Sequence, residues 1–140
     1  MSRVFWDTNL FIYLIEDTGD HARQVLDLYG RMQERGDVLF TSALTLGEVL
    51  VKPTERRDDA LRERYELAIS NGASVLPFDI RAAPHYAEIR RDRTIRPPDA
   101  IQLACAAAAG MDLFITNDDR LTRKSVRGIH FIQPLDRAFI

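Results

Sequence analysis

The segment Val4-Phe5-Trp6-Asp7 is a short apolar run that ends at a carboxylate. Such a run predicts a buried strand followed by a turn. Residues 9–15 are mostly apolar with helical spacing, and Gly19-Asp20 ends that segment. A buried strand that leads directly into a helix is the repeating unit of α/β domains with parallel sheets.

The same alternation continues along the whole chain. Short apolar runs predict further strands at 38–41, 75–76, 113–115 and 130–132. Helical patterns are expected at 21–35, 44–51, 58–70, 80–93 and 97–109. Pro53 is expected to stop the third helix, and Pro84 is tolerated if it lies in a first turn. The pattern predicts one α/β domain with a mostly parallel sheet, without repeats or linkers.

Composition limits the class of protein. The chain has 140 residues, 46% of them hydrophobic, and a formal net charge of −2. This charge does not suit a protein that grips nucleic acid with its whole surface, so a polyanion would need a local basic patch or metal ions. Cys105 is the only cysteine, which excludes an intrachain disulfide. No signal peptide or membrane span is expected, and we therefore predict a soluble cytoplasmic protein.

Four carboxylates occur at positions where a site is expected. Asp7 and Asp118 follow predicted strands, Asp99 begins a helix, and Glu48 lies within a helix. Sites in parallel sheets form at the carboxyl ends of the strands. Acids that converge there repel one another, and Mg²⁺ or Mn²⁺ is the usual remedy. Such ions activate water and stabilise a phosphodiester transition state, so the acids point to nuclease chemistry.

Helix capping is the alternative explanation for three of these acids. Asp7, Asp99 and Asp118 each precede a helix, and Asp is a preferred N-cap residue. Glu48 discriminates between the two explanations, because an acid in the middle of a helix cannot cap it. It shares a face with Leu44 and Val51, and a carboxylate on an apolar face needs a partner.

Four motifs resemble the PIN-domain family and occur in the family's order. They are a strand that runs into Asp-Thr-Asn at 5–9, a second acidic segment at 46–50, an Asp-Ala turn into an alanine-rich helix at 98–104, and Thr-x-Asp at 115–118. Each motif is weak alone, whereas the ordered set is specific and covers nearly the whole chain. Within the family the chain looks most like the short VapC-type toxins of bacterial toxin–antitoxin pairs.

The resemblance implies a single PIN domain over residues 1–140, with a five-stranded parallel sheet between layers of helices. It implies a Mg²⁺- or Mn²⁺-dependent endoribonuclease that forms a homodimer and is blocked by a small antitoxin. Carried over by position, the metal-binding and catalytic acids are Asp7, Glu48, Asp99 and Asp118. Thr116 supplies a nearby hydroxyl, and Asn9 orients Asp7. Asp119 adjoins Asp118 and is the alternative for the fourth acid; the Thr-x-Asp spacing favours Asp118, which leaves Asp119 available to cap the short helix that follows.

Two basic clusters flank the acids. The first consists of Arg90, Arg91, Arg93 and Arg96, and the second of Lys52, Arg56 and Arg57. Either cluster can contact RNA phosphates, and Arg96, Arg93 and Lys52 are the predicted substrate-binding residues. The alternative is a solvated helix face balanced by Glu88 and Asp92.

Other residues of interest have structural interpretations. Trp6 can stack on a base, but its place at the end of a buried strand favours a core role. The three histidines have no metal-ligand spacing, and Cys105 is expected to be a small buried apolar residue.

Two rival functions remain open. The first is a Mg²⁺-dependent aspartyl phosphatase or phosphoacceptor domain. It needs a second acid close to the nucleophile, which Asp7-Thr8-Asn9 lacks, and usually a late lysine, whereas Lys124 lies in a polar turn. The second is a PIN fold kept only for protein contacts, and the intact set of four acids argues against it.

Overall fold

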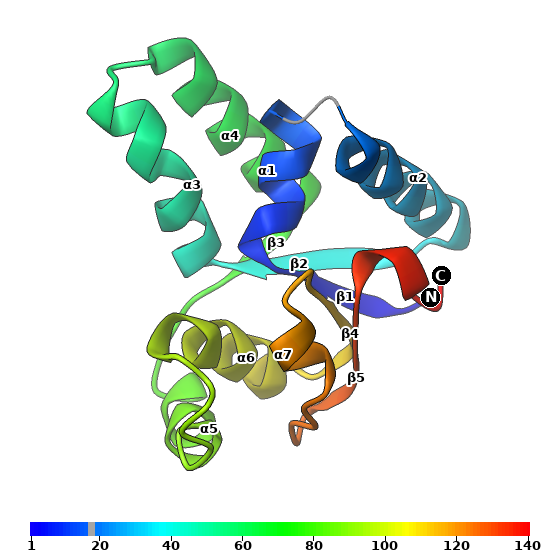
Figure 1. Ribbon diagram of the computed structural model, residues 1–140, viewed down its shortest axis with the longest axis vertical. Helices are drawn as coiled ribbons and strands as arrows, with labels where there is room; N and C mark the ends of the chain where they lie inside the picture. The colour runs from blue at the N-terminus through cyan, green and yellow to red at the C-terminus, as the bar shows by residue number, and fades with distance from the viewer. Residues whose placement is uncertain (17–18) are drawn as a thin grey trace.

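The computed structural model describes residues 1–16 and 19–140. Strands and helices alternate along the chain, with the bounds of most elements within two residues of the predicted ones (Figure 1). The elements are β1 (Arg3–Trp6), α1 (Thr8–Glu16), α2 (Asp20–Arg35), β2 (Val38–Ser42), α3 (Ala43–Glu55), α4 (Asp59–Gly72), β3 (Ser74–Leu76), α5 (Ala82–Ile89), α6 (Pro97–Ala109), β4 (Met111–Ile115), α7 (Asp119–Thr122), β5 (Ile129–Gln133) and the 3-10 helix η1 (Leu135–Arg137).

The five strands form one sheet in the order β3-β2-β1-β4-β5, and every neighbouring pair is parallel. β1 is central, with Phe5 aligned to Phe40 of β2 and to Phe114 of β4. The order changes direction at β1, because the chain moves first to one side of it and then to the other. The carboxyl ends of β1 and β4 therefore lie side by side at a topological switch point, where sites form in such sheets.

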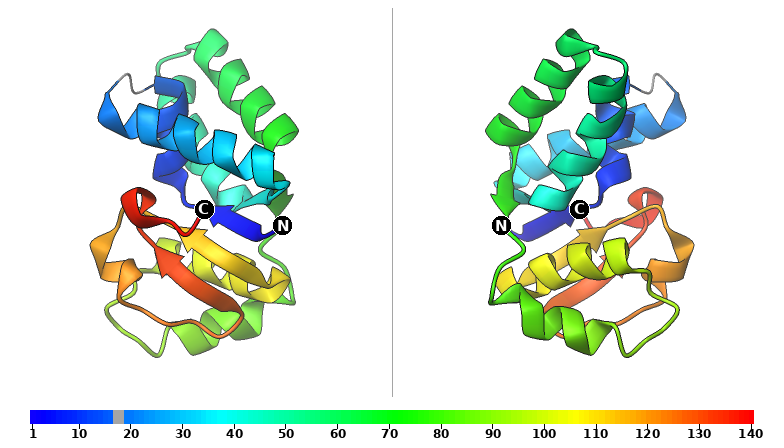
Figure 2. Two further views of the ribbon diagram at one scale, coloured as in Figure 1. Left: turned by 90° about the vertical axis from the view of Figure 1, so that its right-hand side faces the viewer. Right: turned by 90° about the vertical axis from the view of Figure 1, so that its left-hand side faces the viewer.

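Helices cover both faces of the sheet, as the two turned views show (Figure 2). Alternate residues of a strand point to opposite faces. Val4 and Trp6 therefore pack among α1 to α4, whereas Phe5 packs against α5 and α6 and stacks on Phe114 at 4.9 Å between ring centroids. This three-layer arrangement confirms the predicted fold class.

The expected stop at Pro53 is wrong, because α3 continues through Pro53 to Glu55. A proline in a helix removes one hydrogen bond to the carbonyl four residues back and crowds that carbonyl, and α3 tolerates both costs at Pro53. Pro53 is also buried, and its carbonyl accepts a hydrogen bond from the backbone N–H of Asp58 at 2.9 Å. Packing and this terminal bond favour continuation of the helix.

The helix predicted over 80–93 is also too long, because α5 spans only Ala82–Ile89. At its start the Asp79 carboxylate accepts hydrogen bonds from the backbone N–H groups of Arg81 and Ala82. Beyond its end Asp92 accepts from both the N–H and the hydroxyl of Thr94. Such local side-chain bonds compete with helical ones and turn the chain toward α6. Pro84 lies in the first turn, as expected.

None of the helices within the described residues is long and apolar enough to cross a lipid bilayer.

Candidate active site

Asp7 and Asp118 meet at the carboxyl ends of the adjacent strands β1 and β4. The N–H of Asp7 continues the sheet by donating to the carbonyl of Ile115 at 3.0 Å. Thr116 links the two acids, because its hydroxyl donates to Asp7 Oδ2 at 2.8 Å and accepts from the N–H of Asp118 at 3.1 Å. The structure thus brings together three of the predicted site residues.

The half-buried Asp7 carboxylate is held by neutral donors. Besides Thr116, the N–H of Thr8 donates to Asp7 Oδ1 at 2.8 Å. Burial raises the pKa of Asp7 from 3.8 to about 6, because removal from water penalises the charged form. The two hydrogen bonds lower that pKa, and the negative charges of Asp99 and Glu48 raise it. Asp7 therefore lies within electrostatic reach of both other acids.

Glu48 reaches the site from α3 through a hydroxyl that the sequence analysis did not single out. The Thr8 hydroxyl donates to Glu48 Oε1 at 2.6 Å. The same Thr8 presents its N–H to Asp7, so a single residue at the start of α1 contacts two acids. The exposed Glu48 carboxylate therefore has a defined place beside Asp7.

Gln102 orients the Thr8 hydroxyl from beneath. Its side-chain amide donates to Thr8 Oγ1 at 3.0 Å and to Thr45 Oγ1 at 2.7 Å, and its carbonyl oxygen accepts from Ser42 Oγ. Because Thr8 Oγ1 accepts from Gln102, its own proton is free to point at Glu48. Gln102 is 98% buried, since only 2% of its surface is exposed. A glutamine inside an apolar helix needs such partners, and this was the available sequence signal.

Asp99 is the third residue of α6 and does not cap that helix. The N-cap position belongs to Arg96, whose side chain makes no capping bond. Instead, Arg96 Nε donates to Asp99 Oδ2 at 3.3 Å, and its Nη2 lies 3.7 Å from Asp118 Oδ2. Arg96 thus lies between two of the acids, and the capping explanation fails at Asp99.

Asp118 caps α7, as the capping explanation for that acid expects, and Asp119 does not take this position. Asp118 Oδ1 accepts from the backbone N–H of Arg120 at 3.0 Å, and Asp119 is the exposed first residue of that helix. The Arg120 guanidinium also donates to both oxygens of Asp118, at 3.1 and 2.8 Å. These bonds lower the pKa of Asp118. Asp118 is therefore both the N-cap of α7 and one of the acids of the site.

The remaining predicted residues lie around this centre. Asn9 is exposed, and within the described chain the hydrogen bonds to the Asp7 carboxylate come from Thr8 and Thr116 instead. Thr8 and Thr116, rather than Asn9, therefore orient the Asp7 carboxylate. Lys52 lines a groove of about 600 Å³ together with Glu48. Arg93 is exposed in the turn before Arg96.

Members of the first basic cluster differ in their contacts. Arg91 pairs with Glu88 at 2.9 Å, as the solvated-face alternative expects. Arg90 instead donates to the carbonyl of Ile95 at 2.7 Å and shapes the turn. Asp92 pairs with Lys124 at 2.8 Å, so it does not balance its arginine neighbours.

The structural interpretations of other residues are consistent with their surroundings. Trp6 is fully buried, with its ring 5.3 Å from that of Phe11, and Cys105 is buried with a pKa raised to about 11 by that burial. His21 stacks on Tyr13, and His130 lies 3.3 Å from Asp112.

The donor chemistry of the site fits a hard divalent cation, because carboxylate oxygens are the ligands that Mg²⁺ and Mn²⁺ prefer. Asp7 contributes a carboxylate that contacts no cation among the residues placed by the structure. The side-chain positions are not those of a closed coordination sphere. Across residues 1–16 and 19–140, no three His, Cys, Asp or Glu side chains are grouped closely enough to hold one ion. Arg96 contacts Asp99 and Asp118, and Arg120 contacts Asp118, whereas Glu48 bonds to the Thr8 hydroxyl.

Comparisons with known proteins identify the family and the fold. The sequence pattern of the PIN domain matches residues 4–126. Curated protein sequences gave no match. One similar solved structure is VapBC2 from Rickettsia felis bound to a DNA fragment from the promoter, with a TM-score of 0.76 and 14% identity over 94% of this chain and 98% of that one. A second is DNA-bound VapBC from Salmonella typhimurium, with a TM-score of 0.67 and 22% identity over 96% of this chain and 99% of that one. A third is VapBC-5 of the VapBC toxin–antitoxin family from Mycobacterium tuberculosis, with a TM-score of 0.65 and 20% identity over 95% of this chain and 99% of that one. At these identities the similarity establishes a shared fold.

Proposed function

Because this chain belongs to the PIN-domain family, we propose that it is a divalent-metal-dependent endoribonuclease and the toxin of a type II toxin–antitoxin pair. The observation that carries the proposal is the Asp7 carboxylate, which is half-buried at a switch point, within reach of Glu48 and Asp99, and paired with no cation among the described residues. A stable fold gains nothing from such a charge, since burial of an unpaired carboxylate is costly. A bound cation removes that cost.

Mg²⁺ or Mn²⁺ is held by the oxygens of Asp7, Glu48, Asp99 and Asp118 in this proposal. When bound, the ion supplies an activated water and stabilises negative charge on a phosphodiester. The chain's own contribution is orientation: Thr116 fixes Asp7, and Thr8 fixes both Asp7 and Glu48. Bonds to ligands from such outer residues typically control metal affinity by about 10- to 100-fold.

RNA reaches the acids past a basic rim in this proposal. Arg96 already contacts two of the acids, and its guanidinium can exchange these for a phosphate oxygen. Arg93 and Lys52 are exposed on either side. Contacts of this kind position the backbone without reading its sequence.

A small antitoxin and a second copy of the chain are the proposed protein partners, in the cytoplasm. The similar structures named above are complexes called VapBC. The groove that contains Glu48 also has apolar walls, and Val51 at its edge is 51% exposed. Leu26 on α2 is 58% exposed. Apolar residues exposed at a protein surface suit contacts with other chains.

The phosphoacceptor rival loses support at Lys124. Its amine donates to Thr94 at 2.8 Å and pairs with Asp92, rather than with Asp7. The late lysine that this chemistry requires is therefore committed elsewhere.

Cleavage of a mixed single-stranded RNA by purified protein tests the proposal. We expect cutting with Mn²⁺ or Mg²⁺, none with chelator, and a loss of more than about 100-fold in Asp7→Asn, which removes a proposed ligand. The control is Asp27→Asn on α2, whose exposed carboxylate pairs with Arg31. Absence of divalent-ion binding in calorimetry at millimolar concentration would contradict the proposal.

A further inference from the structure

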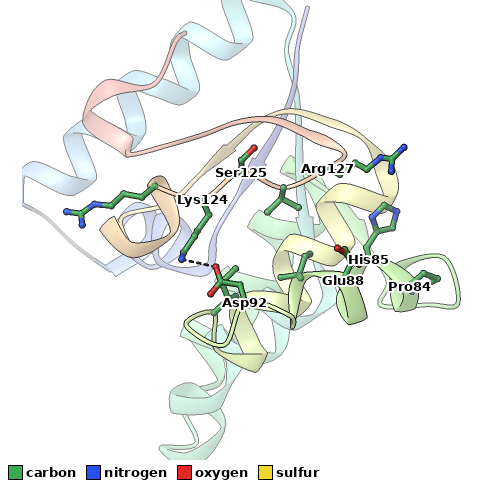
Figure 3. A pocket seen from close by; sticks show the side chains of 11 residues that line it. Pro84, His85, Glu88, Asp92, Lys124, Ser125 and Arg127 are labelled. Carbon is green, nitrogen blue, oxygen red and sulfur yellow. Dashed lines mark ion pairs between the residues drawn. The ribbon is translucent and has the colours of Figure 1, made fainter.

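A second cavity, of about 810 Å³, lies beside the acids rather than among them. It is bounded by α5, by the turn that leads to α6, and by the segment between α7 and β5 (Figure 3). Lys124 and Asp92 meet at one end of this pocket, whereas His85, Pro84 and Arg127 lie at the other. Its size falls within the usual range of small-molecule sites, about 300–1,000 Å³.

The lining combines an apolar floor with a basic rim. Ile89, Ile95 and Val126 are buried and form the apolar part. The two acids of the lining are paired, Glu88 with Arg91 at 2.9 Å and Asp92 with Lys124 at 2.8 Å. Arg123 and Arg127 are exposed, and neither makes an ion pair with any residue that the structure describes. In a chain of net charge −2, two uncompensated guanidinium groups beside an apolar floor favour a ligand with a flat ring and negative charge.

The pocket adjoins the proposed catalytic centre through two short connections. Ile95, in its lining, precedes Arg96, which contacts Asp99 and Asp118. On the other side, Asp118 caps α7, and Arg123 follows the last residue of that helix. The four residues of α7 span about 6 Å, at about 1.5 Å per residue. A strand of RNA that crosses the acids therefore has only a short distance to the pocket.

We propose that this pocket binds one unpaired nucleotide of the RNA substrate next to the cleaved bond. The base lies on the apolar floor near the His85 ring, and the flanking phosphates contact Arg123 and Arg127. Only an unstacked base fits such a pocket, so the substrate at this point is single-stranded. The inference rests on the proposed ribonuclease function and adds a substrate class to it.

Binding of a short single-stranded RNA in chelator, measured by fluorescence anisotropy at several salt concentrations, tests the pocket without cleavage. Each lost phosphate contact lowers the slope of log K against log salt by about 0.7 for a single strand. Arg123→Ala/Arg127→Ala should therefore bind more weakly, with a slope smaller by about 1.4. The matched control is Arg23→Ala/Arg62→Ala, which removes two exposed arginines from α2 and α4.

A second variant separates a base pocket from a merely basic surface. Ser125 is an exposed lining residue, so the larger side chain of Ser125→Trp fills part of the pocket and leaves every charge in place. It should weaken RNA binding by about 5- to 100-fold, the range expected for the loss of one stacked base, with an unchanged salt slope. Circular dichroism and thermal melting establish that both variants fold.

The outcomes distinguish this inference from the proposed function. If the wild type cleaves RNA but the pocket variants bind like the control, the pocket inference is overturned and the nuclease stands. If the wild type cleaves nothing, yet binding depends on Arg123, Arg127 and Ser125 as described, the pocket still binds an RNA nucleotide, but the nuclease proposal fails and with it the position next to a cleaved bond. If the variants bind RNA normally but lose a protein partner, the pocket is a protein surface and the inference is wrong.

Discussion

The two halves of the acidic site are built on opposite electrostatic principles. Asp7 and Glu48 are bonded by hydroxyls and a backbone N–H, and burial raises the Asp7 pKa to about 6. Asp99 and Asp118 lie against guanidinium groups, and Arg120 lowers the pKa of Asp118. The first half keeps negative charge without compensation, whereas the second half is already neutralised.

This difference indicates how the halves divide the proposed work. A cation gains most where charge is unbalanced, so Asp7 is expected to dominate metal affinity. The arginines of the other half are held close to the acids and can pass to phosphate oxygens when substrate arrives. Three predictions test this division, in order of decreasing effect.

The largest effect is expected in the pH dependence of stability without metal. A carboxyl whose folded pKa is raised stabilises the fold while protonated, and that stabilisation is lost as the pH rises from 3.8 through about 6. The free energy of unfolding of wild type relative to Asp7→Asn should therefore fall by up to about 3 kcal/mol, since each pKa unit corresponds to about 1.4 kcal/mol. Urea unfolding in chelator between about pH 4 and pH 7 measures it.

Mn²⁺ provides the control for this experiment. Because an ion bound to the charged carboxylate stabilises only the folded state, wild type should regain stability at neutral pH in Mn²⁺ more than Asp7→Asn does. Parallel pH profiles of the two proteins in chelator would show that Asp7 is not destabilised by its surroundings.

A smaller effect is expected from the hydroxyl that serves the uncompensated half. Thr8→Val keeps the shape and the N–H that binds Asp7, but it removes the donor to Glu48 and the acceptor for Gln102. Mn²⁺ affinity, measured by calorimetry, should fall by about 10- to 100-fold. Thr8→Ser retains the hydroxyl and should restore most of that affinity. Equal Mn²⁺ affinity in Thr8→Val and wild type would remove Thr8 from the site.

The smallest effect, with the opposite sign, is expected in the neutralised half. Arg96→Gln frees Asp99 and Asp118 from a guanidinium that is 61% exposed, and exposed pairs are weak. Mn²⁺ should bind up to about fivefold more tightly, while RNA should bind less tightly. Arg91→Gln, which loses only the surface pair with Glu88, is the control. A weaker Mn²⁺ affinity in Arg96→Gln would contradict the division between the halves.

The sequence predicted the secondary structure well where apolar periodicity was strong, as in β1 and α6. It failed at Pro53 and at the end of α5. In both places the outcome depends on contacts that periodicity does not register, the burial of Pro53 and the side-chain bonds of Asp92. A local rule about proline or helical pattern is overruled when tertiary packing contributes more free energy than one hydrogen bond.

The sequence predicted several residues of the candidate site, but not the hydrogen bonds that join them. Asp7, Thr116 and Asp118 were identifiable because strand ends and motifs mark them. Thr8 and Gln102 were missed as functional residues, because a hydroxyl or a buried amide acquires a role only from its neighbours. Asn9 was assigned the task that Thr8 performs, since adjacent residues at a strand-to-helix turn cannot be told apart by spacing.

The sequence by itself determined the α/β alternation, the parallel sheet and the acids at the strand ends, because these depend on local periodicity and on where chain direction changes. Tertiary structure alone decided which acid keeps its charge unbalanced and which is paired. It brought Arg96, from the turn before α6, to Asp118, which follows β4, and it enclosed a pocket between α5 and the chain after α7. Burial and ion pairing depend on distances between residues far apart in the chain, and no local pattern fixes those distances.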